Sequence, residues 1–268
     1  MLRSAISLLA LSLLSFNSPM ATTRPVGITN TATESATALN ENLTYEKKEL
    51  AFASHLEQLY RDADLQNKGL SFPVFKKAYI GFVNLKQRAL ISPSKSILTV
   101  VDFTKSSREE RLWVIDLHAR KVLFNTLVAH GRNTGNDKAT KFSNQPNSYM
   151  SSLGFYVTDK TYYGKHGLSL RLQGMDKGFN TNAMQRAIVV HGADYATADF
   201  IKQYGRLGRS LGCPALPREI SKEVIDVIKD ETVLFVHHND KTYSSDFLDM
   251  EKAVETFAAG MPDNSITI

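Results

Sequence analysis

The chain of 268 residues contains one cysteine, Cys213, in the stretch GRSLGCPALP. A lone thiol forms no intramolecular disulfide, so Cys213 is either a small buried hydrophobic residue or a reactive group. A free cysteine, with a pKa of about 8.5, is only a few per cent thiolate at neutral pH. A nucleophilic Cys213 therefore needs a base or a cation beside it.

The residues around Cys213 suit attack on a carbonyl carbon. Gly212 allows the backbone to bend tightly just before the thiol, and Pro214 restricts the chain just after it. Leu211, Gly212 and Cys213 each keep a backbone N–H. Such groups bind the oxyanion that forms during acyl transfer, and each is worth roughly 10²–10³ in rate.

The base for such a cysteine is expected among the seven histidines of the chain. Four are expected at the solvated surface or at a strand end, where one of a pair faces outward: His55, His118, His237 and His238. The other three each precede a glycine: His130, His166 and His191. His191 ends the apolar run RAIVV, and a scaffold presents a polar side chain to a cleft at such a strand end. On position alone, a functional His191 and a buried structural histidine remain equally open.

Strands dominate the elements that must position these residues. Short runs rich in β-branched and aromatic side chains predict strands over 96–103, 111–117, 121–130, 154–159, 167–174, 186–193 and 231–238. Apolar residues at three- and four-residue steps predict two or three helices within 43–89, and further helices over 199–209, 218–229 and 245–260. Ser221 and Ser245 are expected to cap the last two helices. A stripe of aromatic residues is expected to pack in the core: Phe72, Phe75, Tyr79 and Phe82.

This order of elements predicts an α+β fold. A β-rich domain is expected over 95–240, preceded by a small helical region over 43–92 and followed by a C-terminal helix and tail over 241–268. No glycine-rich phosphate loop follows a strand, which argues against a dinucleotide-binding sheet.

The first residues, MLRSAISLLALSLLSF, have the basic start and the short apolar run of a secretory signal peptide, expected over 1–21. A membrane anchor that is kept is the alternative. A linker rich in Thr, Ala and Asn is expected over 22–42. The formal net charge is +5, but the lysines and arginines are scattered, so the sequence predicts no nucleic-acid-binding arm.

Two motifs together resemble the signature of the L,D-transpeptidase catalytic domain of bacterial cell-wall enzymes. The strand VVHGA and the later SLGCPAL are similar to the His-Gly pair and the Ser/Thr-x-Gly-Cys motif of that family, here in a Ser-x-Gly-Cys-Pro form. The upstream SSLGFYV resembles the Thr-Pro-x-Gly-x-Phe strand of the family, and GRNTGNDKAT and VVDFTK resemble a murein L,D-transpeptidase-like subgroup. The resemblance covers roughly residues 95–240 and implies a β-sandwich with helices.

By this resemblance Cys213 is the nucleophile and His191 the base. Oxyanion binding and loop support are implied for four further residues: Gly192, Ser210, Leu211 and Gly212. The family usually has histidine at the position of Leu211, and often arginine or asparagine at the position of Ala215. Substrate contacts are therefore expected from other polar residues: Arg132, His166, Arg206 and Arg209.

The implied reaction is a two-step acyl transfer with a thioester on Cys213. The thiolate attacks the carbonyl between an L-centre and a D-residue of a peptidoglycan stem peptide, and an amine of a second stem peptide resolves the thioester. No metal or organic cofactor, no nucleic acid and no stable membrane insertion after signal removal are implied. The protein is expected to be exported, to the periplasm or cell wall of a bacterium.

Two alternatives remain open at this point. Water in place of the amine makes the same fold an L,D-carboxypeptidase. The residues at Leu211 and Ala215 also fit a non-catalytic cell-wall-binding protein with a degenerate site. A papain-like protease is disfavoured because His191 precedes Cys213 in the chain. The acyl acceptor and the oligomeric state do not follow from the sequence.

Overall fold

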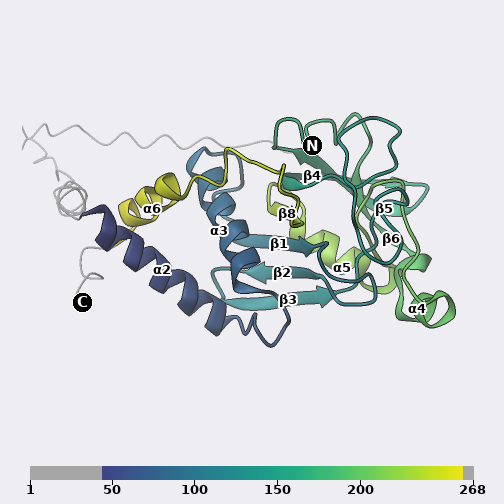
Figure 1. Cartoon of the computed structure of the whole chain (residues 1–268), viewed down its shortest axis with the longest axis horizontal. Coiled ribbons are helices and arrows are strands. Elements are labelled where there is room, and N and C mark those ends of the chain that lie inside the picture. The colour runs from purple at the N-terminus through teal and green to yellow at the C-terminus, as the bar shows by residue number, and fades with distance from the viewer. Residues whose placement is uncertain (1–43, 262–268) are drawn as a thin grey trace, which may run out of the picture.

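The computed structural model describes residues 44–261, and it confirms the predicted fold class: a helical region precedes a large sheet flanked by helices (Figure 1). The described helices are α2 (Tyr45–Asp62), α3 (Phe72–Gln87), the 3₁₀ turn η1 (Asp194–Ala196), α4 (Ala198–Tyr204), α5 (Arg218–Ile228) and α6 (Met250–Ala259). The strands are β1 (Ile97–Asp102), β2 (Leu112–Asp116), β3 (Lys121–Thr126), β4 (Gly154–Gly164), β5 (Gly167–Gly174), β6 (Val189–Ala193), β7 (Ala215–Pro217) and β8 (Val233–His237). The expected signal peptide over 1–21 and linker over 22–42 lie outside the described residues.

The strands of the described region form one sheet in the order β3-β2-β1-β8-β4-β5-β6-β7. Most neighbours run antiparallel, but β1 with β8 and β6 with β7 run parallel. A parallel pair needs a crossover connection. The crossover from β6 to β7 contains η1, α4 and the loop that carries Cys213. Figure 1 shows β5, β6 and α4 at one end of the long axis, and α2 and α6 at the other.

Side chains that alternate along the strands contribute to two hydrophobic layers, one on each face of the sheet. Phe155 and Val157 of β4 join one layer, while Tyr156 between them joins the other. This follows from the strand geometry, which points successive side chains to opposite faces. Both faces of the sheet are covered, which explains why the predicted strands are apolar along most of their length.

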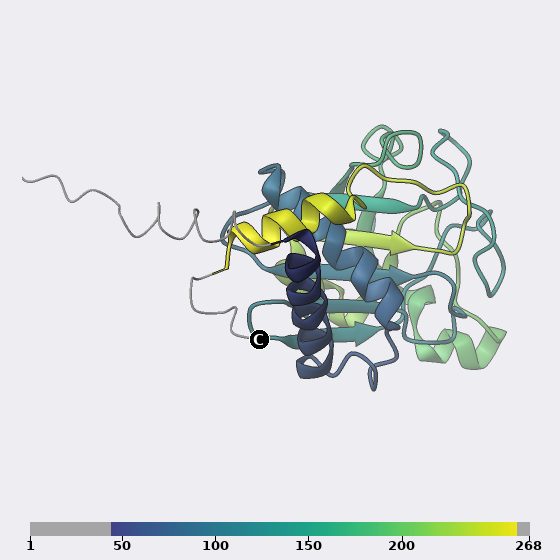
Figure 2. The same cartoon turned by 60° about the vertical axis from the view of Figure 1, so that its left-hand side comes forward.

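Helices α2, α3 and α6 cover one face of the sheet, and α5 packs on the other (Figure 2). The expected core position of the aromatic stripe is confirmed for Phe75, Tyr79 and Phe82, which are buried, while Phe72 packs at the edge of the same layer. No helix within residues 44–261 is long and apolar enough to cross a membrane.

Strand β6 is shorter than predicted. The strand expected over 186–193 begins only at Val189, because Ala187 has a positive φ of 52° that interrupts the extended chain. The short strand β7 has no counterpart among the predicted strands, since three residues show no alternation.

Two other elements also end early. The strand expected over 121–130 ends at Thr126 as β3. The helix expected over 199–209 ends at Tyr204, because Gly205 adopts the left-handed conformation, with a φ of 71°, that stops a helix.

The predicted serine caps are wrong. Helix α5 begins at Arg218, so Ser221 lies inside it, and its hydroxyl donates to the Arg218 carbonyl at 3.0 Å. The cap of α6 is Asp249 instead of Ser245, because the Asp249 side chain accepts the N–H of Lys252 at 3.0 Å.

A buried guanidinium and a buried imidazole lie beneath the loop that carries Cys213. Arg111 donates to two backbone carbonyls and to Nδ1 of His130 at 2.9 Å. Because arginine only donates, Nδ1 of His130 accepts, and the ring proton sits on Nε2, which lies 3.3 Å from the Gly135 carbonyl. The backbone carbonyl of His130 accepts the N–H of Ser210 at 2.9 Å, so this pair supports the loop.

Gly81 of α3 is expected to resist substitution by alanine. A Cβ there would lie 2.0 Å from Cζ of Phe155, whose ring stacks on Phe235 at 4.3 Å. Alanine gains about 1 kcal/mol over glycine in a helix interior, but overpacking costs roughly 1–3 kcal/mol. We expect Gly81→Ala to lower the free energy of unfolding in urea titrations, and to cost less in a Phe155→Leu background. A Gly81→Ala protein as stable as the wild type would contradict this packing.

The Arg111–His130 contact makes stability depend on pH. Burial, followed by the charge of Arg111, lowers the pKa of His130 from 6.5 to about 4 in the folded protein. The unfolded chain therefore binds more protons between these values, so stability is full above pH 6.5 and is lost toward pH 4. The loss from this group is at most about 3 kcal/mol.

We expect His130→Gln, which keeps an acceptor for Arg111, to flatten the acid side of the stability curve. Denaturant titrations of both proteins between about pH 7 and pH 4 measure the difference. Parallel curves for the two proteins would show that His130 does not titrate as its surroundings indicate.

Candidate active site

Cys213 lies in the loop just before β7, and His191 lies on the neighbouring strand β6, at one edge of the sheet. His191 is the central residue of β6 and pairs in register with Ala215, the first residue of β7. Cys213 lies two residues before Ala215, which places it level with Val189, two residues before His191. The contact of Cys213 Sγ with the Val189 N–H, at 3.5 Å, agrees with this alignment.

Ser210 and Gly212 hold the cysteine loop (residues 210–214) in one conformation. Ser210 Oγ accepts the N–H of Gly212 at 3.0 Å and donates to the Cys213 carbonyl at 2.6 Å. Gly212 has a φ of 125°, and a Cβ there would lie 2.8 Å from the Met150 carbonyl oxygen. Only glycine fits this conformation and this space.

Two backbone N–H groups of the cysteine loop are available to a ligand. In the part of the chain that the structure describes, the N–H groups of Leu211 and Cys213 donate to no protein atom. The N–H of Gly212, by contrast, is taken by Ser210. The Leu211 side chain is 52% exposed, so solvent reaches this part of the loop.

The thiol of Cys213 is partly buried against the segment that leads into β6. Sγ lies 3.5 Å from the Val189 N–H and 3.7 Å from the Ala187 carbonyl. Burial raises the pKa of the Cys213 thiol, and the Val189 N–H and the charges of Arg186 and Lys165 oppose this rise. The resting group is therefore a neutral thiol.

His191 presents one basic nitrogen. Its Nδ1 lies 3.0 Å from the Gly192 carbonyl oxygen, which only accepts, so Nδ1 carries the proton and Nε2 keeps its lone pair. The ring stacks on His166 at a centroid distance of 4.4 Å. Burial lowers the pKa of His191, and the nearby charges of His166, Arg218 and Lys165 add to this effect. His191 is therefore a neutral proton acceptor at pH 7.

No hydrogen bond joins the thiol to the imidazole within residues 44–261. The Cys213 thiol is turned toward Val189, while Nδ1 of His191 is turned toward Gly192. The pKa of the acid is raised and that of the base is lowered. The resting pair is thus a neutral thiol in the loop before β7 and a neutral imidazole on β6, without a stored thiolate.

The four residues expected to contact a substrate fall into two groups. Arg209 Nη1 lies 3.3 Å from the Arg132 carbonyl, and the Arg132 guanidinium lies over the Tyr149 ring at 4.1 Å. Burial and the charges of Arg206 and Arg132 lower the pKa of Arg209. These three arginines therefore gather beside the cysteine loop. His166, from the β4–β5 hairpin, lies instead over the candidate base.

Sequence reasoning did not single out Arg186 and Lys165, the two cations that act on the thiol. Lys165 lies at the tip of the β4–β5 hairpin. Arg186 is the one lysine or arginine in the stretch RAIVVHGA, and this was the signal available in the sequence. Both approach Cys213 only through the tertiary fold, which residue spacing does not show.

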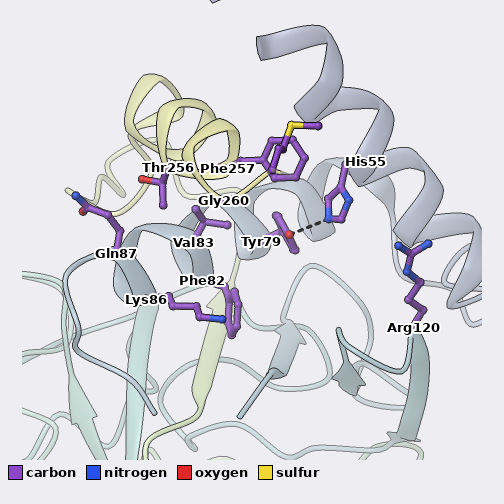
Figure 3. Close-up of a pocket in the computed structure, with 11 residues that line it drawn as sticks. His55, Tyr79, Phe82, Val83, Lys86, Gln87, Arg120, Thr256, Phe257 and Gly260 are labelled. Carbon is purple, nitrogen blue, oxygen red and sulfur yellow. Dashed lines mark hydrogen bonds between the residues drawn. The ribbon is translucent and has the colours of Figure 1, made fainter. Parts of the chain in front are cut away.

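A cavity of about 630 Å³ lies between α2, α3 and α6, lined by no residue of β6 or of the cysteine loop (Figure 3). His55 lies in its wall, and its Nε2 is 3.0 Å from the Tyr79 hydroxyl. The His55 ring also packs on Phe257 at 4.9 Å, so the expectation of a solvated His55 is wrong. Within residues 44–261, no group of three or more His, Cys, Asp or Glu side chains is placed to hold a metal ion.

Solved structures similar to this chain include several L,D-transpeptidases. One from Mycobacterium smegmatis is 12% identical, with a TM-score of 0.35, over 53% of this chain and 59% of that one. One from Mycobacterium tuberculosis H37Rv is 15% identical, with a TM-score of 0.33, over 53% and 58%. A mutant of the helical cell shape determining protein Pgp2 from Campylobacter jejuni is 13% identical, with a TM-score of 0.37, over 69% and 59%. The chain thus spans about three fifths of the length of these structures.

No curated protein matches the chain. The family model of the L,D-transpeptidase catalytic domain, however, matches residues 66–237, which is more than half of the sequence. The matched region runs from just before α3 to the end of β8 and contains both His191 and Cys213. The chain therefore belongs to the family of L,D-transpeptidase catalytic domains.

Proposed function

We propose that the protein is an exported L,D-transpeptidase, a cysteine acyltransferase that acts on peptidoglycan stem peptides. The observation that carries the proposal is the β6–β7 register, which places the only cysteine of the chain beside the strand of a neutral histidine. Cys213 is the nucleophile and His191 is the base. A thiol in the loop before one strand and a base on the neighbouring strand, next to free backbone donors, are the parts that acyl transfer requires.

In the first step, Cys213 Sγ attacks the carbonyl carbon between an L-centre and the terminal D-residue of a stem peptide. The C–S bond forms while the thiol proton moves to Nε2 of His191. The N–H groups of Leu211 and Cys213 bind the oxyanion. Collapse of this intermediate breaks the C–N bond, the imidazolium gives its proton to the leaving amine, and a thioester remains on Cys213.

In the second step, the amine of another stem peptide attacks the thioester carbonyl and gives a proton to His191. The C–S bond breaks, and the leaving thiolate takes the proton back from the imidazolium. The products are a cross-linked peptide and the original thiol, so no metal or organic cofactor enters the balance.

The neutral resting pair supports general-base catalysis. The raised pKa of Cys213 keeps its proton on sulfur, and the lowered pKa of His191 keeps Nε2 unprotonated at neutral pH. The proton then moves as the C–S bond forms. In this proposal Ser210 aims the loop donors, and the Gly192 carbonyl fixes the tautomer of His191.

The proposal also includes the residues that contact the substrate and the location of the protein. The cluster of Arg132, Arg206 and Arg209 beside the loop suits the carboxylates of stem peptides, and His166 lies over the base from the other side. Peptidoglycan lies outside the inner membrane, so the proposal includes export to the periplasm or cell wall. The basic and apolar stretch within 1–21 supports this location.

Incubation with a carbapenem tests the nucleophile. The strained β-lactam carbonyl is attacked by an activated thiol, so we expect intact-mass spectrometry to show one covalent adduct on the wild-type protein. We expect no adduct on Cys213→Ala, whose folding is checked by circular dichroism. An unmodified wild-type protein, or an adduct that persists in Cys213→Ala, would contradict the assignment of Cys213 as the nucleophile.

Variants of the two stacked histidines, His191 and His166, test which of them is the base. General-base catalysis contributes typically about 10²–10⁴ in rate, so we expect His191→Ala to slow carbapenem acylation by at least about a hundredfold. His166 touches the base only through ring stacking, and we expect His166→Ala to cost about tenfold or less. Stopped-flow fluorescence measures both rates, and an equal loss in the two variants would show that the base is misassigned.

A further inference from the structure

Arg186 begins the segment that contacts the thiol. The next residue, Ala187, places its carbonyl 3.7 Å from Cys213 Sγ, and Val189 places its N–H 3.5 Å from the same atom. The backbone N–H of Arg186 donates to the Asn182 carbonyl at 2.8 Å, which fixes where the side chain starts. The thiol therefore lies against a short piece of chain that opens with a guanidinium.

Neutral oxygens hold this guanidinium. Nη1 of Arg186 donates to the Ser143 carbonyl at 2.6 Å and to the Ser152 hydroxyl. Nη2 donates to the Ser148 hydroxyl at 3.2 Å and to the Met150 carbonyl. No carboxylate forms an ion pair with Arg186 in the described region, 44–261. The half-buried positive charge is thus fixed in position but not neutralised.

The guanidinium lies against the cysteine loop. A Cβ on Gly212 would lie 3.2 Å from Nη2 of Arg186, so the charge touches the residue just before Cys213. The segment that holds Arg186 holds the loop as well, because Ser151 Oγ donates to the Gly212 carbonyl at 3.2 Å. A charge in this position acts on the sulfur through protein more than through water.

The other titratable groups around the thiol come from three further elements. Lys165 lies at the exposed tip of the β4–β5 hairpin, where water and salt screen its charge. Tyr195 belongs to η1, and burial raises its pKa to about 12. His191 on β6 is neutral because burial lowers its pKa. Arg186 is therefore the half-buried group that carries a full charge beside Cys213.

We propose that Arg186 is the electrostatic positioning residue of the site: its guanidinium stabilises the negative charge that develops on Cys213 Sγ as the proton leaves. The catalytic use of this charge rests on the proposed function, in which Cys213 is the nucleophile. An opposite charge close to a group favours its charged form by roughly one pKa unit or more, and the charge of Arg186 acts on the thiol in this direction. One unit corresponds to about a tenfold change in the thiolate fraction.

Alkylation by iodoacetamide tests this proposal without using activity. Because Cys213 is the only cysteine, the pH dependence of alkylation reports its ionisation alone. We expect Arg186→Gln to move the midpoint up by about one pH unit and to slow alkylation at neutral pH about tenfold. Arg186→Lys keeps the charge and should keep the midpoint near that of the wild type, even where the melting temperature falls.

Lys165→Gln is the matched control, because it removes an exposed cation near the same thiol. We expect it to move the midpoint less than Arg186→Gln does. A purely structural Arg186 predicts a lower melting temperature with an unchanged midpoint in Arg186→Gln, and this result overturns the proposal. A midpoint in Arg186→Lys about one pH unit above that of the wild type overturns it too, and this measurement decides the question where Arg186→Gln does not fold.

The carbapenem experiment tests the proposed function separately from the role of Arg186. A wild-type protein that forms no carbapenem adduct contradicts the role of Cys213 as nucleophile. The shift of the alkylation midpoint in Arg186→Gln then still establishes that the charge of Arg186 favours the thiolate of Cys213, beside the effects of burial and of the Val189 N–H.

Discussion

The geometry of the site depends on the pairing of one very short strand, β7, from both sides. Ala215 of β7 pairs with His191 on β6, and it exchanges two backbone hydrogen bonds with Ala129, of 2.8 and 3.3 Å. Its side chain is fully buried. A slip by one residue would turn the side chains of β7 to the opposite face, so this register is strongly fixed. The positions of Cys213 and the cysteine loop relative to His191 follow from it.

Around that register, neutral contacts stiffen the site, and Arg186 brings a half-buried positive charge to the cysteine loop. The Ser210 hydroxyl closes the cysteine loop, and the Gly192 carbonyl orients the imidazole. Burial keeps the thiol and the imidazole neutral at rest. In the proposed mechanism, negative charge develops on Cys213 Sγ only when a substrate binds, and the guanidinium of Arg186 is already in position to stabilise it. Such preorganised groups need no rearrangement during the reaction.

The sequence carried enough information for the fold class because its strands alternate or stay apolar over five or more residues, as in β4 and β8. Cys213 is visible because it is the only cysteine of the sequence, and the His-Gly pair at His191 because it follows the apolar run RAIVV. Strand β7 shows no period in three residues, and its pairing with Ala129 is a tertiary fact. Arg186 is held by oxygens of a loop that lies far away in the chain, so no local pattern reveals it.

The most direct measurement is time-resolved intact-mass spectrometry of the wild-type protein with a purified disaccharide-tetrapeptide from peptidoglycan. The account predicts a transient adduct that lacks the terminal D-residue of the donor and maps to the peptide containing Cys213, followed by a cross-linked dimer with an L-to-D bond. Turnover of the tetrapeptide with no adduct on Cys213, or a wild-type protein that leaves the tetrapeptide unchanged, would contradict the account.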